Sequence, residues 1–476
     1  MKNVFFDIKT NRNYFHYCLK IARELIDSQK YEAAASYLSN IASFGWNNTT
    51  GYYVNWQLES LLNKLGETIP EYEPTSLKKH PTSNSRLNIL HVASILYEVG
   101  GHTQLLFNWI KNDPDNNHTI IITNQNEGAL PHNKIKLFSL KEDLFLCLKD
   151  LDGTILGRSK QLRKKAQNYD LIILHIHPDD IIPVIAFSTT SLPPIMFLNH
   201  ADHIFWIGAS VLDILIQIRE INIENDKFHR TIEQKQFFLP IPIDNSVCKE
   251  NRSSDVFTHL NITSDNIMLL STASEYKFKP NDTHNFFESI IPVLDKSPNV
   301  LLFIVGISKF SFLTGKYQHK QIIYLGSLDI KTLGYYEDLV DIYLESFPVS
   351  SFTAMLQPIL KRKPVHLMYI PNKVIQMFSG KYPFLYSKSR EQWQTELSLL
   401  INNKEKREKI AQDQYDDLIK TYDILVWKEK LQELYKEVRL VRHTIDCREG
   451  DVFFEDENIA FLHGMSFNRN IRHLDS

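Results

Sequence analysis

Apolar side chains recur at helical spacing over the first part of the chain. Tyr14, Cys18 and Leu25 belong to one such run, and a second run continues through Leu38 and Ile41. Because an α-helix turns once in about 3.6 residues, this spacing gathers the apolar side chains on one face. The pattern predicts helix from residue 13 to about 66, with a third helix over residues 56–65 at its end.

The first two of these helices resemble a tetratricopeptide-type hairpin. Ala33, Ala34 and Ala35 allow two helices to pack closely. One hairpin is too few to form a solenoid, so we expect residues 1–80 to be a helical appendage that caps the fold or docks a protein partner. Residues 67–86 are rich in Pro, Ser, Thr and Lys and predict a linker.

From Leu87 the pattern changes to short apolar strands that alternate with helices. Such alternation predicts a parallel sheet covered on both faces, here a Rossmann-like domain over residues 86–240. The predicted strands are 87–95, 118–123, 134–140, 170–176 and 194–199, and the predicted helices are 102–111, 144–168 and a buried one at 204–218.

A second Rossmann-like domain repeats this plan over residues 241–440, after a proline-containing exit at 237–243. Two doubly wound α/β domains in tandem predict a cleft between the carboxyl ends of two sheets, where ligands bind. The tail, 441–476, has no assignment. The predicted strands are 266–271, 300–305, 322–325, 339–344 and 364–367, and residues 390–436 are predicted to be largely helical.

Composition narrows the classes of protein that fit. The formal net charge of −3 over 476 residues gives no basic footprint for nucleic acid. The four cysteines have no CxxC or metal-ligand spacing, which favours a reducing, cytoplasmic location. The N-terminus does not resemble a signal peptide, and no apolar run approaches the ~20 residues of a membrane span. Peripheral contact with a membrane stays open.

The segment from Glu345 to Val365 is the most informative in the chain. A predicted strand ends in a loop of small residues that includes Ser350, Ser351 and Thr353, and a short helix is predicted over residues 354–361. A helix N-terminus offers unpaired backbone N–H groups and a positive dipole end to an anion. We therefore expect a diphosphate here, although an ordinary turn between strand and helix is the alternative.

This segment resembles the nucleotide-sugar loop of GT-B glycosyltransferases, and within them the protein O-GlcNAc transferase type. The resemblance places Thr353 on a phosphate-binding threonine. The segment departs from the family's sequence pattern at three positions. Ser351 and Arg362 each replace a glycine, and Gln357 replaces the acid that holds the ribose hydroxyls. Ser350, Ser351, Thr353 and Gln357 are the donor-binding residues that the resemblance implies in this loop.

Two further loops resemble the same family. Gly100 and Gly101, after the first predicted strand, match the glycine loop that faces the acceptor and the donor phosphates, and His102 would point into the cleft. The alternative for His102 is a residue that merely caps a helix. Lys277 matches the lysine that neutralises the donor diphosphate and stabilises the departing nucleotide. A solvated surface lysine is its alternative, and Lys279 is the fallback.

A histidine-rich segment follows the strand at 194–199 and is predicted to open a helix. Asn199, His200 and His203 resemble a segment of the same glycosyltransferases, where a histidine could take a proton from an acceptor hydroxyl. The unperturbed pKa of histidine, ~6.5, suits such a base. His177 is expected to shape the acceptor side. Zinc binding by His200 and His203 is the competing interpretation, but no third ligand has a specific spacing.

Together these motifs imply a metal-independent GT-B glycosyltransferase of the hexosyltransferase type that needs no cofactor. The donor would be a nucleotide sugar, expected to be UDP-linked, and the acceptor a glycan, protein or small molecule. The catalytic candidates are His102, His200 and Lys277. Two alternatives stay open: a catalytically degenerate GT-B subunit that binds acceptor or activates a partner, and a GT-B-shaped epimerase or phosphorylase.

Overall fold

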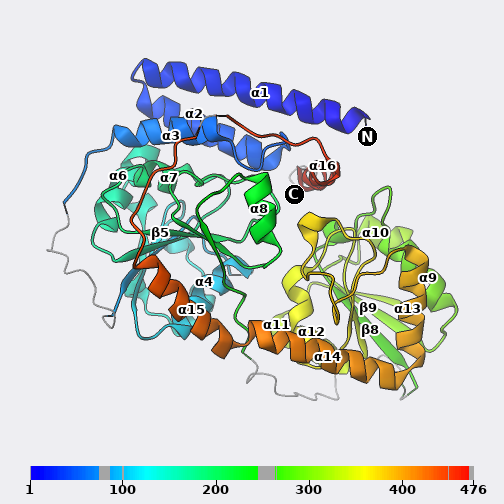
Figure 1. The fold of residues 1–476 in the computed structure, drawn as a ribbon. Helices are drawn as coiled ribbons and strands as arrows, with labels where there is room; N and C mark the ends of the chain where they lie inside the picture. Colours follow the sequence, from blue (N-terminus) through cyan, green and yellow to red (C-terminus); the bar gives the residue numbers. More distant parts are fainter. Residues whose placement is uncertain are drawn as a thin grey trace. The chain divides into compact units, whose positions relative to one another are not determined.

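The chain forms two compact units, each built on its own parallel sheet (Figure 1). The computed structural model describes residues 2–73, 86–98, 101–244, 263, 265–448 and 450–470. The first unit combines Met1–Pro242 with Trp427–Ser476, and the second is Ile243–Val426. The second unit therefore ends before residue 440, because the helix that follows it packs on the first unit.

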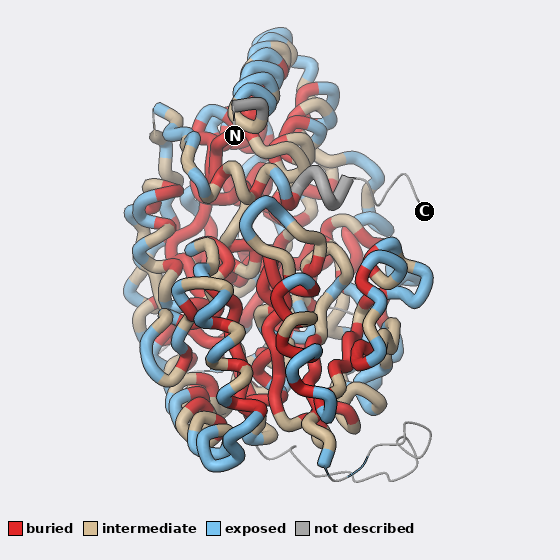
Figure 2. The backbone as a smooth tube through the Cα atoms, turned by 90° about the vertical axis from the view of Figure 1, so that its right-hand side faces the viewer, coloured by how far each residue is buried: buried red, intermediate tan, exposed pale blue. Residues whose placement is uncertain are grey.

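The sheet of the first unit has seven parallel strands in the order β3-β2-β1-β4-β5-β6-β7. The order reverses between β1 and β4, and ligands of such sheets bind at the carboxyl ends beside this switch point. Its central strands β1, β4 and β5 are almost entirely buried, and Figure 2 shows in red the buried residues of the molecule as seen from the right-hand side of Figure 1. The strands are β1 (Asn88–Ala93), β2 (Asn117–Ile122), β3 (Phe145–Cys147), β4 (Leu171–His175), β5 (Ile195–Asn199), β6 (Ile214–Gln217) and β7 (Lys235–Phe238).

Helices cover this sheet, and the last of them come from the C-terminal part of the chain. Trp109 on α4 packs edge-on against Trp427 on α15, with ring centroids 5.7 Å apart, and its indole N–H donates to the Tyr435 hydroxyl at 3.0 Å. These contacts fix α15 to the first unit. Its helices are α4 (Gly101–Asn112), α5 (His132–Leu137), α6 (Ile155–Ala166), α7 (Ile181–Phe187), α8 (Asn222–His229), α15 (Ile424–Val438) and α16 (Glu457–Asn470).

The three N-terminal helices α1 (Lys2–Asp27), α2 (Tyr31–Asn47) and α3 (Trp56–Glu67) are integral to the first unit. Their apolar residues share one hydrophobic core with the strands of the sheet. Glu59 on α3 is buried, and its carboxylate accepts the backbone N–H groups of Gly208 at 2.7 Å and Ser210 at 3.1 Å. The predicted helices are therefore present but do not form a separate appendage; their tetratricopeptide character stays a prediction.

The tail with no assignment from sequence crosses the first unit before α16 and has no helix or strand over the described residues 441–448 and 450–456. Both ring nitrogens of His443 face acceptors, with Nδ1 2.9 Å from Asp213 Oδ2 and Nε2 3.0 Å from the Phe187 carbonyl. Further along, the Phe454 N–H donates to the Gly51 carbonyl at 2.8 Å. We call residues 441–456 the C-terminal strap, because it joins α15 to the N-terminal helices.

Three predicted elements of the first unit are wrong. Residues 134–140 were predicted as a strand, but residues 134–137 belong to α5, and Ile135 in this helix and Phe138 just after it pack on the core. Residues 204–218 form turns and then β6, because Glu59 binds the backbone N–H groups that a helix would use. Residues 145–147 form β3, so the helix predicted at 144–168 begins only at Ile155.

The second unit has five parallel strands in the order β10-β9-β8-β11-β12. All five strands predicted for this unit are present. Within the described residues, no helix of either unit is long and apolar enough to cross a membrane. The strands are β8 (Ile267–Thr272), β9 (Val300–Val305), β10 (Ile322–Gly326), β11 (Ile342–Leu344) and β12 (Val365–His366). The helices are α9 (Phe286–Asp295), α10 (Phe312–Lys316), α11 (Ile330–Leu339), α12 (Leu356–Leu360), α13 (Arg390–Asn402) and α14 (Lys404–Tyr422).

Three histidines form a hydrogen-bonded row across the first sheet. His118 Nε2 lies 2.8 Å from the Asp113 carbonyl, which can only accept, so this nitrogen carries the proton. In a neutral row, His118 Nδ1 then accepts from His91 Nε2 and His91 Nδ1 accepts from His175 Nε2, each at 3.0 Å. Burial lowers the pKa of His91 and of His175 far below the ordinary value, and it also lowers the pKa of His118.

This row predicts that the first unit loses stability in mild acid. In the unfolded chain each histidine takes a proton near a pKa of ~6.5, whereas the folded rings stay neutral. The unfolded state therefore binds more protons below that pH. Above about pH 7 the neutral histidines make their full contribution to the free energy of unfolding. As the pH falls through 6.5, the free energy of unfolding decreases by up to ~1.4 kcal/mol per pH unit for each histidine.

This loss is measured as a shift in the urea midpoint between about pH 7.5 and about pH 5.5. Hydrogen exchange of the backbone amides of β1 and β4 follows the unfolding. The His91→Gln variant keeps one donor and one acceptor but does not titrate, so its pH dependence should be shallower. A urea midpoint that is the same at both pH values would contradict the prediction.

Candidate functional site

Histidines gather at the carboxyl ends of β4 and β5. His102, in the first turn of α4, donates its Nε2–H to the His175 carbonyl at 2.8 Å. The ring of His200 lies 4.5 Å from that of His102, and the ring of His177 lies 6.3 Å from it. The Tyr97 hydroxyl is 3.2 Å from His177 Nε2. The structure thus brings together three histidines that the sequence singled out separately.

The protonation of this cluster follows from its burial. Burial and the neighbouring His200 hold the pKa of His102 well below the ordinary value, and burial lowers the pKa of His200 to about 4. Both rings are therefore neutral at neutral pH. Since Nε2 of His102 carries the proton, its Nδ1 carries the lone pair, and that buried atom has no hydrogen-bond donor among the described residues. The ordinary pKa expected from sequence does not apply here.

The loop that carries His200 is a turn and not the predicted helix. Asp202 holds it, because its two carboxylate oxygens accept from Arg219 Nε and Nη2, each at 2.7 Å. Arg230 donates to the carbonyls of Asp202 at 3.0 Å and Ile204 at 2.7 Å. These buried arginines fix the loop through its carboxylate and carbonyl oxygens.

The two histidines that could have shared zinc have different surroundings. His203 Nδ1 lies 3.2 Å from Asp202 Oδ1, whereas His200 Nδ1 lies 3.4 Å from the Leu198 carbonyl. Over the described parts of the chain, no three His, Cys, Asp or Glu side chains are arranged to hold a metal ion. Among these side chains, His200 and His203 therefore have no third ligand beside them.

Asn199 lies inside the protein. It is buried, and its amide donates to Gln217 Oε1 at 3.0 Å and to Asp226 Oδ2 at 2.6 Å. Its side chain thus links the ends of β5 and β6 to α8. The structure thus gives Asn199 an internal supporting role, and its place on the acceptor side stays a prediction.

In the second unit, Lys277 joins two neighbouring loops at the carboxyl edge of the sheet. It lies in a 3-10 turn (Glu275–Phe278) that follows β8. Its Nζ donates to the Ser350 carbonyl at 2.9 Å, and it also lies 4.9 Å from the centre of the Phe352 ring. Two residues that the sequence proposed as one anion site are therefore in direct contact.

The loop after β11 differs from the predicted anion cradle. Ser350 is buried and its hydroxyl accepts the Phe352 N–H at 3.1 Å, while Ser351 accepts from the Tyr343 hydroxyl at 3.3 Å. Thr353 and Gln357 are exposed. A 3-10 turn occupies Phe352–Met355, so the helix begins at Leu356 and not at residue 354. Because α12 has only five residues, the dipole argument from sequence is weaker.

The glycine loop of the first unit is described in part. Gly100 lies outside the described residues, and Gly101 is the exposed first residue of α4. A Cβ at Gly101 would meet no atom within 4 Å. The space beside it is therefore open, and its role with a ligand stays a prediction.

Sequence reasoning gave no role to Glu345, which ends the strand before the anion loop. Its Oε2 accepts the Met368 N–H at 2.7 Å. Burial raises the pKa of Glu345 to about 7, although the Ser350 hydroxyl and Lys277 oppose the shift. An acid placed directly after a buried apolar strand was the available signal.

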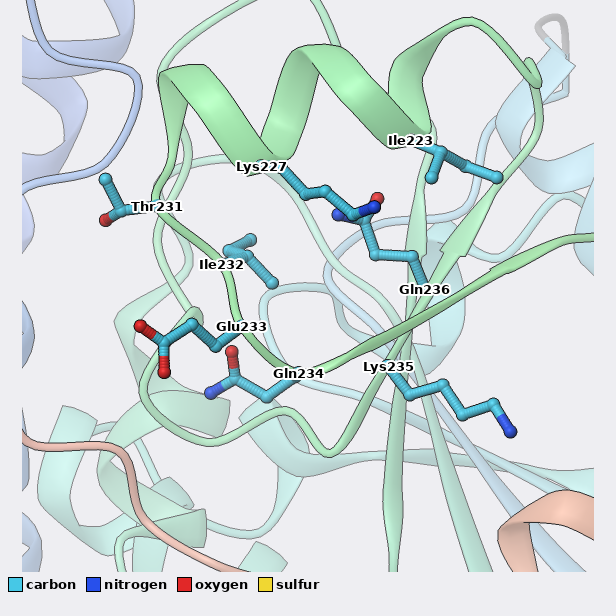
Figure 3. A pocket seen from close by; sticks show the side chains of 8 residues that line it. All are labelled: Ile223, Lys227, Thr231, Ile232, Glu233, Gln234, Lys235 and Gln236. Carbon is cyan, nitrogen blue, oxygen red and sulfur yellow. The ribbon is translucent and has the colours of Figure 1, made fainter.

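A separate open hollow lies between α8 and β7 (Figure 3). Its volume is about 630 Å³. Lys227 and Lys235, which line it, are already paired with Glu224 at 3.0 Å and Glu437 at 2.9 Å. None of the candidate residues lines it, so it is distinct from both sites. The lining residues are Ile223, Lys227, Thr231, Ile232, Glu233, Gln234, Lys235 and Gln236.

Comparison with known proteins shows which solved structures have a similar fold. No protein-family model and no curated protein matches the chain. Among solved structures, Anabaena HepE in complex with UDP and glucose matches with a TM-score of 0.55 and 14% identity, over 74% of this chain and 100% of HepE. A glycosyltransferase from Rickettsia africae matches with a TM-score of 0.56 and 13% identity, over 74% and 98% of the two chains.

An O-GlcNAc transferase mutant of Thermobaculum terrenum matches over a larger part of this chain. Its TM-score is 0.52 at 12% identity, and the match spans 89% of this chain and 84% of the transferase. With two parallel sheets in tandem, these matches confirm the predicted GT-B fold.

A glycine holds the loops after β8 and β9 together, which gives a test of the site's framework. Gly306 has φ +96°, and a Cβ there would lie 2.1 Å from the Ala273 carbonyl oxygen. We expect Gly306→Ala to destabilise the second unit by at least about 1–2 kcal/mol. Gly315→Ala is the control, because a Cβ at that α10 position meets nothing within 4 Å.

Urea unfolding of the full-length variants, followed by hydrogen exchange of β8 and β9, provides the measurement. The control should be neutral or up to ~1 kcal/mol more stable. Equal stability of the two variants would show that the two loops do not need their close approach.

Proposed function

We propose that this protein is a glycosyltransferase that moves a sugar from a nucleotide-sugar donor to an acceptor hydroxyl. The contact between Lys277 Nζ and the Ser350 carbonyl, 2.9 Å, carries this proposal. It brings a cation and a hydroxyl-rich loop together at the edge of a parallel sheet where ligands bind. The fold shared with HepE, whose solved structure contains UDP and glucose, supports the same conclusion.

We assign donor binding to the second unit and acceptor binding to the first. Lys277 would neutralise the diphosphate, with the backbone and hydroxyls of Ser350, Ser351 and Thr353 beside it. Gln357 would meet the ribose hydroxyls through an uncharged amide. In this proposal the donor is UDP-linked, and side chains and not a metal ion offset the charge of the leaving group.

The chemistry exchanges one bond at the sugar for another. The acceptor oxygen bonds to the anomeric carbon, the bond from that carbon to the diphosphate breaks, and the nucleotide leaves with the electron pair. Lys277 would stabilise the charge that develops on the nucleotide. The acceptor proton would go to His102 Nδ1, whose ring is oriented by the Nε2 contact to the His175 carbonyl at 2.8 Å, or to His200.

The acceptor would be recognised beside these histidines. The rings of Tyr97 and His177 stack with centroids 5.9 Å apart, and Tyr97 is 40% exposed. A flat aromatic face of this kind suits the apolar face of a sugar or a peptide side chain. His203 lies on the same turn as His200 and completes the proposed acceptor side, while Asn199 supports it from within.

A second candidate function is a catalytically degenerate subunit that binds acceptor or activates a partner glycosyltransferase. Gln357 favours it, because an amide replaces the acid expected at the ribose. Calorimetric titration with UDP-, GDP- and dTDP-sugars separates the two candidates. Binding of one of these donors supports the enzyme, whereas binding of none supports the subunit.

Lys277 provides the sharpest test of the donor site. We expect Lys277→Ala to weaken UDP binding about 10- to 100-fold, because a charge-assisted contact to the diphosphate is lost. Calorimetry measures this affinity. Lys279→Ala tests the fallback lysine, which is two residues away and half-buried like Lys277, and it should bind as the wild type does if Lys277 holds the diphosphate. If the two variants bind UDP equally well, Lys277 does not hold the diphosphate.

The base is tested by removing each imidazole. His102→Ala and His200→Ala remove the two candidates, and the variant that lacks the base should turn over about 10²- to 10⁴-fold more slowly. Unchanged UDP affinity in the same variant would separate this loss from a folding defect. Full turnover in both variants would place the base elsewhere.

A further inference from the structure

We propose that the hollow between α8 and β7 is a second binding site, which holds a neutral saccharide of the acceptor away from the reacting sugar. The choice of an acceptor glycan rests on the proposed function and deepens it, because it selects one of the three acceptor classes. The volume of the hollow, about 630 Å³, lies within the range of about 300–1,000 Å³ that small-molecule sites occupy. Its lining comes from α8 and from the segment that leads into and begins β7 (Figure 3).

Two glutamines give the hollow one free acceptor and one free donor. The Gln234 amide donates to Asp446 Oδ2 at 2.9 Å, and Gln236 Oε1 accepts from Gln217 Nε2 at 2.8 Å. These partners fix which way each amide points. Gln234 Oε1 and Gln236 Nε2 are buried atoms without a hydrogen-bond partner among the described residues. Because a buried polar atom is costly to leave unpaired, these two atoms favour a ligand that supplies both a donor and an acceptor.

The charges of the lining favour a neutral ligand. Lys227 and Lys235 are held by the glutamates described above, and Glu233 Oε1 lies 3.7 Å from Arg448 Nη1. A charged ligand would have to compete with a partner that is already in place. A hydroxyl group both donates and accepts, so a sugar can pair with the free acceptor and with the free donor.

The apolar part of the lining suits the same ligand. Ile223 on α8 is half-buried, and Ile232 before β7 is buried. Small-molecule sites combine apolar walls with a few placed polar groups. The two isoleucines would contact the C–H groups of a sugar ring while its hydroxyls meet the amides.

The C-terminal strap holds one wall of the hollow in place. Thr231 has φ +52°, a left-handed conformation that β-branched residues rarely adopt. Its hydroxyl accepts from Trp56 Nε1 at 3.3 Å, and its carbonyl accepts from Arg448 of the strap. Asp446 of the strap also positions Gln234. A wall that is fixed in advance lowers the cost of ordering a site around its ligand.

Hydrogen bonds connect the hollow with the turn that carries His200. Gln217, the partner of Gln236, is the last residue of β6, and its Oε1 accepts from the Asn199 amide at 3.0 Å. Asn199 directly precedes His200, and all of these residues belong to the first unit. The hollow and the proposed acceptor side are therefore parts of one hydrogen-bonded framework. A glycan longer than its reacting sugar has further sugars for such a second site to hold.

Methyl NMR of the full chain tests the proposal at the hollow itself. The δ-methyl groups of Ile223 and Ile232 are followed during titration with maltotriose, cellotriose or chitotriose. We expect at least one trisaccharide to shift both signals in a saturable way, whereas inorganic pyrophosphate should not shift them. An unchanged methyl signal of Ile173 in β4 reports an intact sheet.

Gln236→Glu removes the free donor and keeps an oxygen for Gln217. We expect it to weaken trisaccharide binding about 2- to 10-fold, because one hydrogen bond to the ligand is lost. Asn225→Ala is the control, since Asn225 lies on α8 but not among the lining residues, and it should bind as the wild type does.

The outcomes separate this site from the proposed function. Absence of a shift with all three trisaccharides would overturn the second site, and so would equal affinity of Gln236→Glu and the wild type or a saturable shift with pyrophosphate. Binding of a nucleotide sugar in the same samples would leave the proposed function standing. A trisaccharide that binds in the hollow of a protein that binds no nucleotide sugar would support the saccharide site and contradict the transferase.

Discussion

The buried carboxylate of Glu59 is the constraint on which the first unit depends. It sits on α3, yet its partners are backbone N–H groups of Gly208 and Ser210 in the segment that leads into β6. Burial raises the pKa of Glu59, and the hydrogen bonds from this segment oppose the shift. A side chain from the N-terminal helices therefore pairs backbone N–H groups of the sheet domain that secondary structure would otherwise pair. Separating the N-terminal helices from the sheet domain would leave these polar groups unpaired.

The histidine cluster also depends on contacts between buried polar groups. Asp202 and Arg219 hold the turn that follows His200, and Asn199 ties the strand before it to Gln217 and Asp226. None of these side chains has to contact a ligand in order to contribute to the site. Each fixes the backbone that presents an imidazole, which is how a loop acquires the precision that chemistry requires.

Much of this fold follows from the sequence, and the failures have physical causes. Buried parallel strands such as β4 and β9 are continuous apolar runs, which are easily found. Residues 134–140 alternate like a strand, but a short run also satisfies a helix with one buried face. The segment 204–218 depends on Glu59, about 150 residues away, which no local pattern reveals. The family resemblance assigned Lys277 and Ser350 to one donor site but did not predict their contact. The low pKa of the histidines follows from burial that only the folded chain defines.

The C-terminal strap has a consequence for how the chain is made. The first unit is completed by Trp427–Ser476, which follows the whole of the second unit in sequence and contains most of α15, the strap and α16. During synthesis, the second unit can fold as soon as Val426 has emerged, while the first still lacks the partner of Asp213 that His443 supplies. The unit that begins first is therefore completed only after the whole of the second unit has been synthesised.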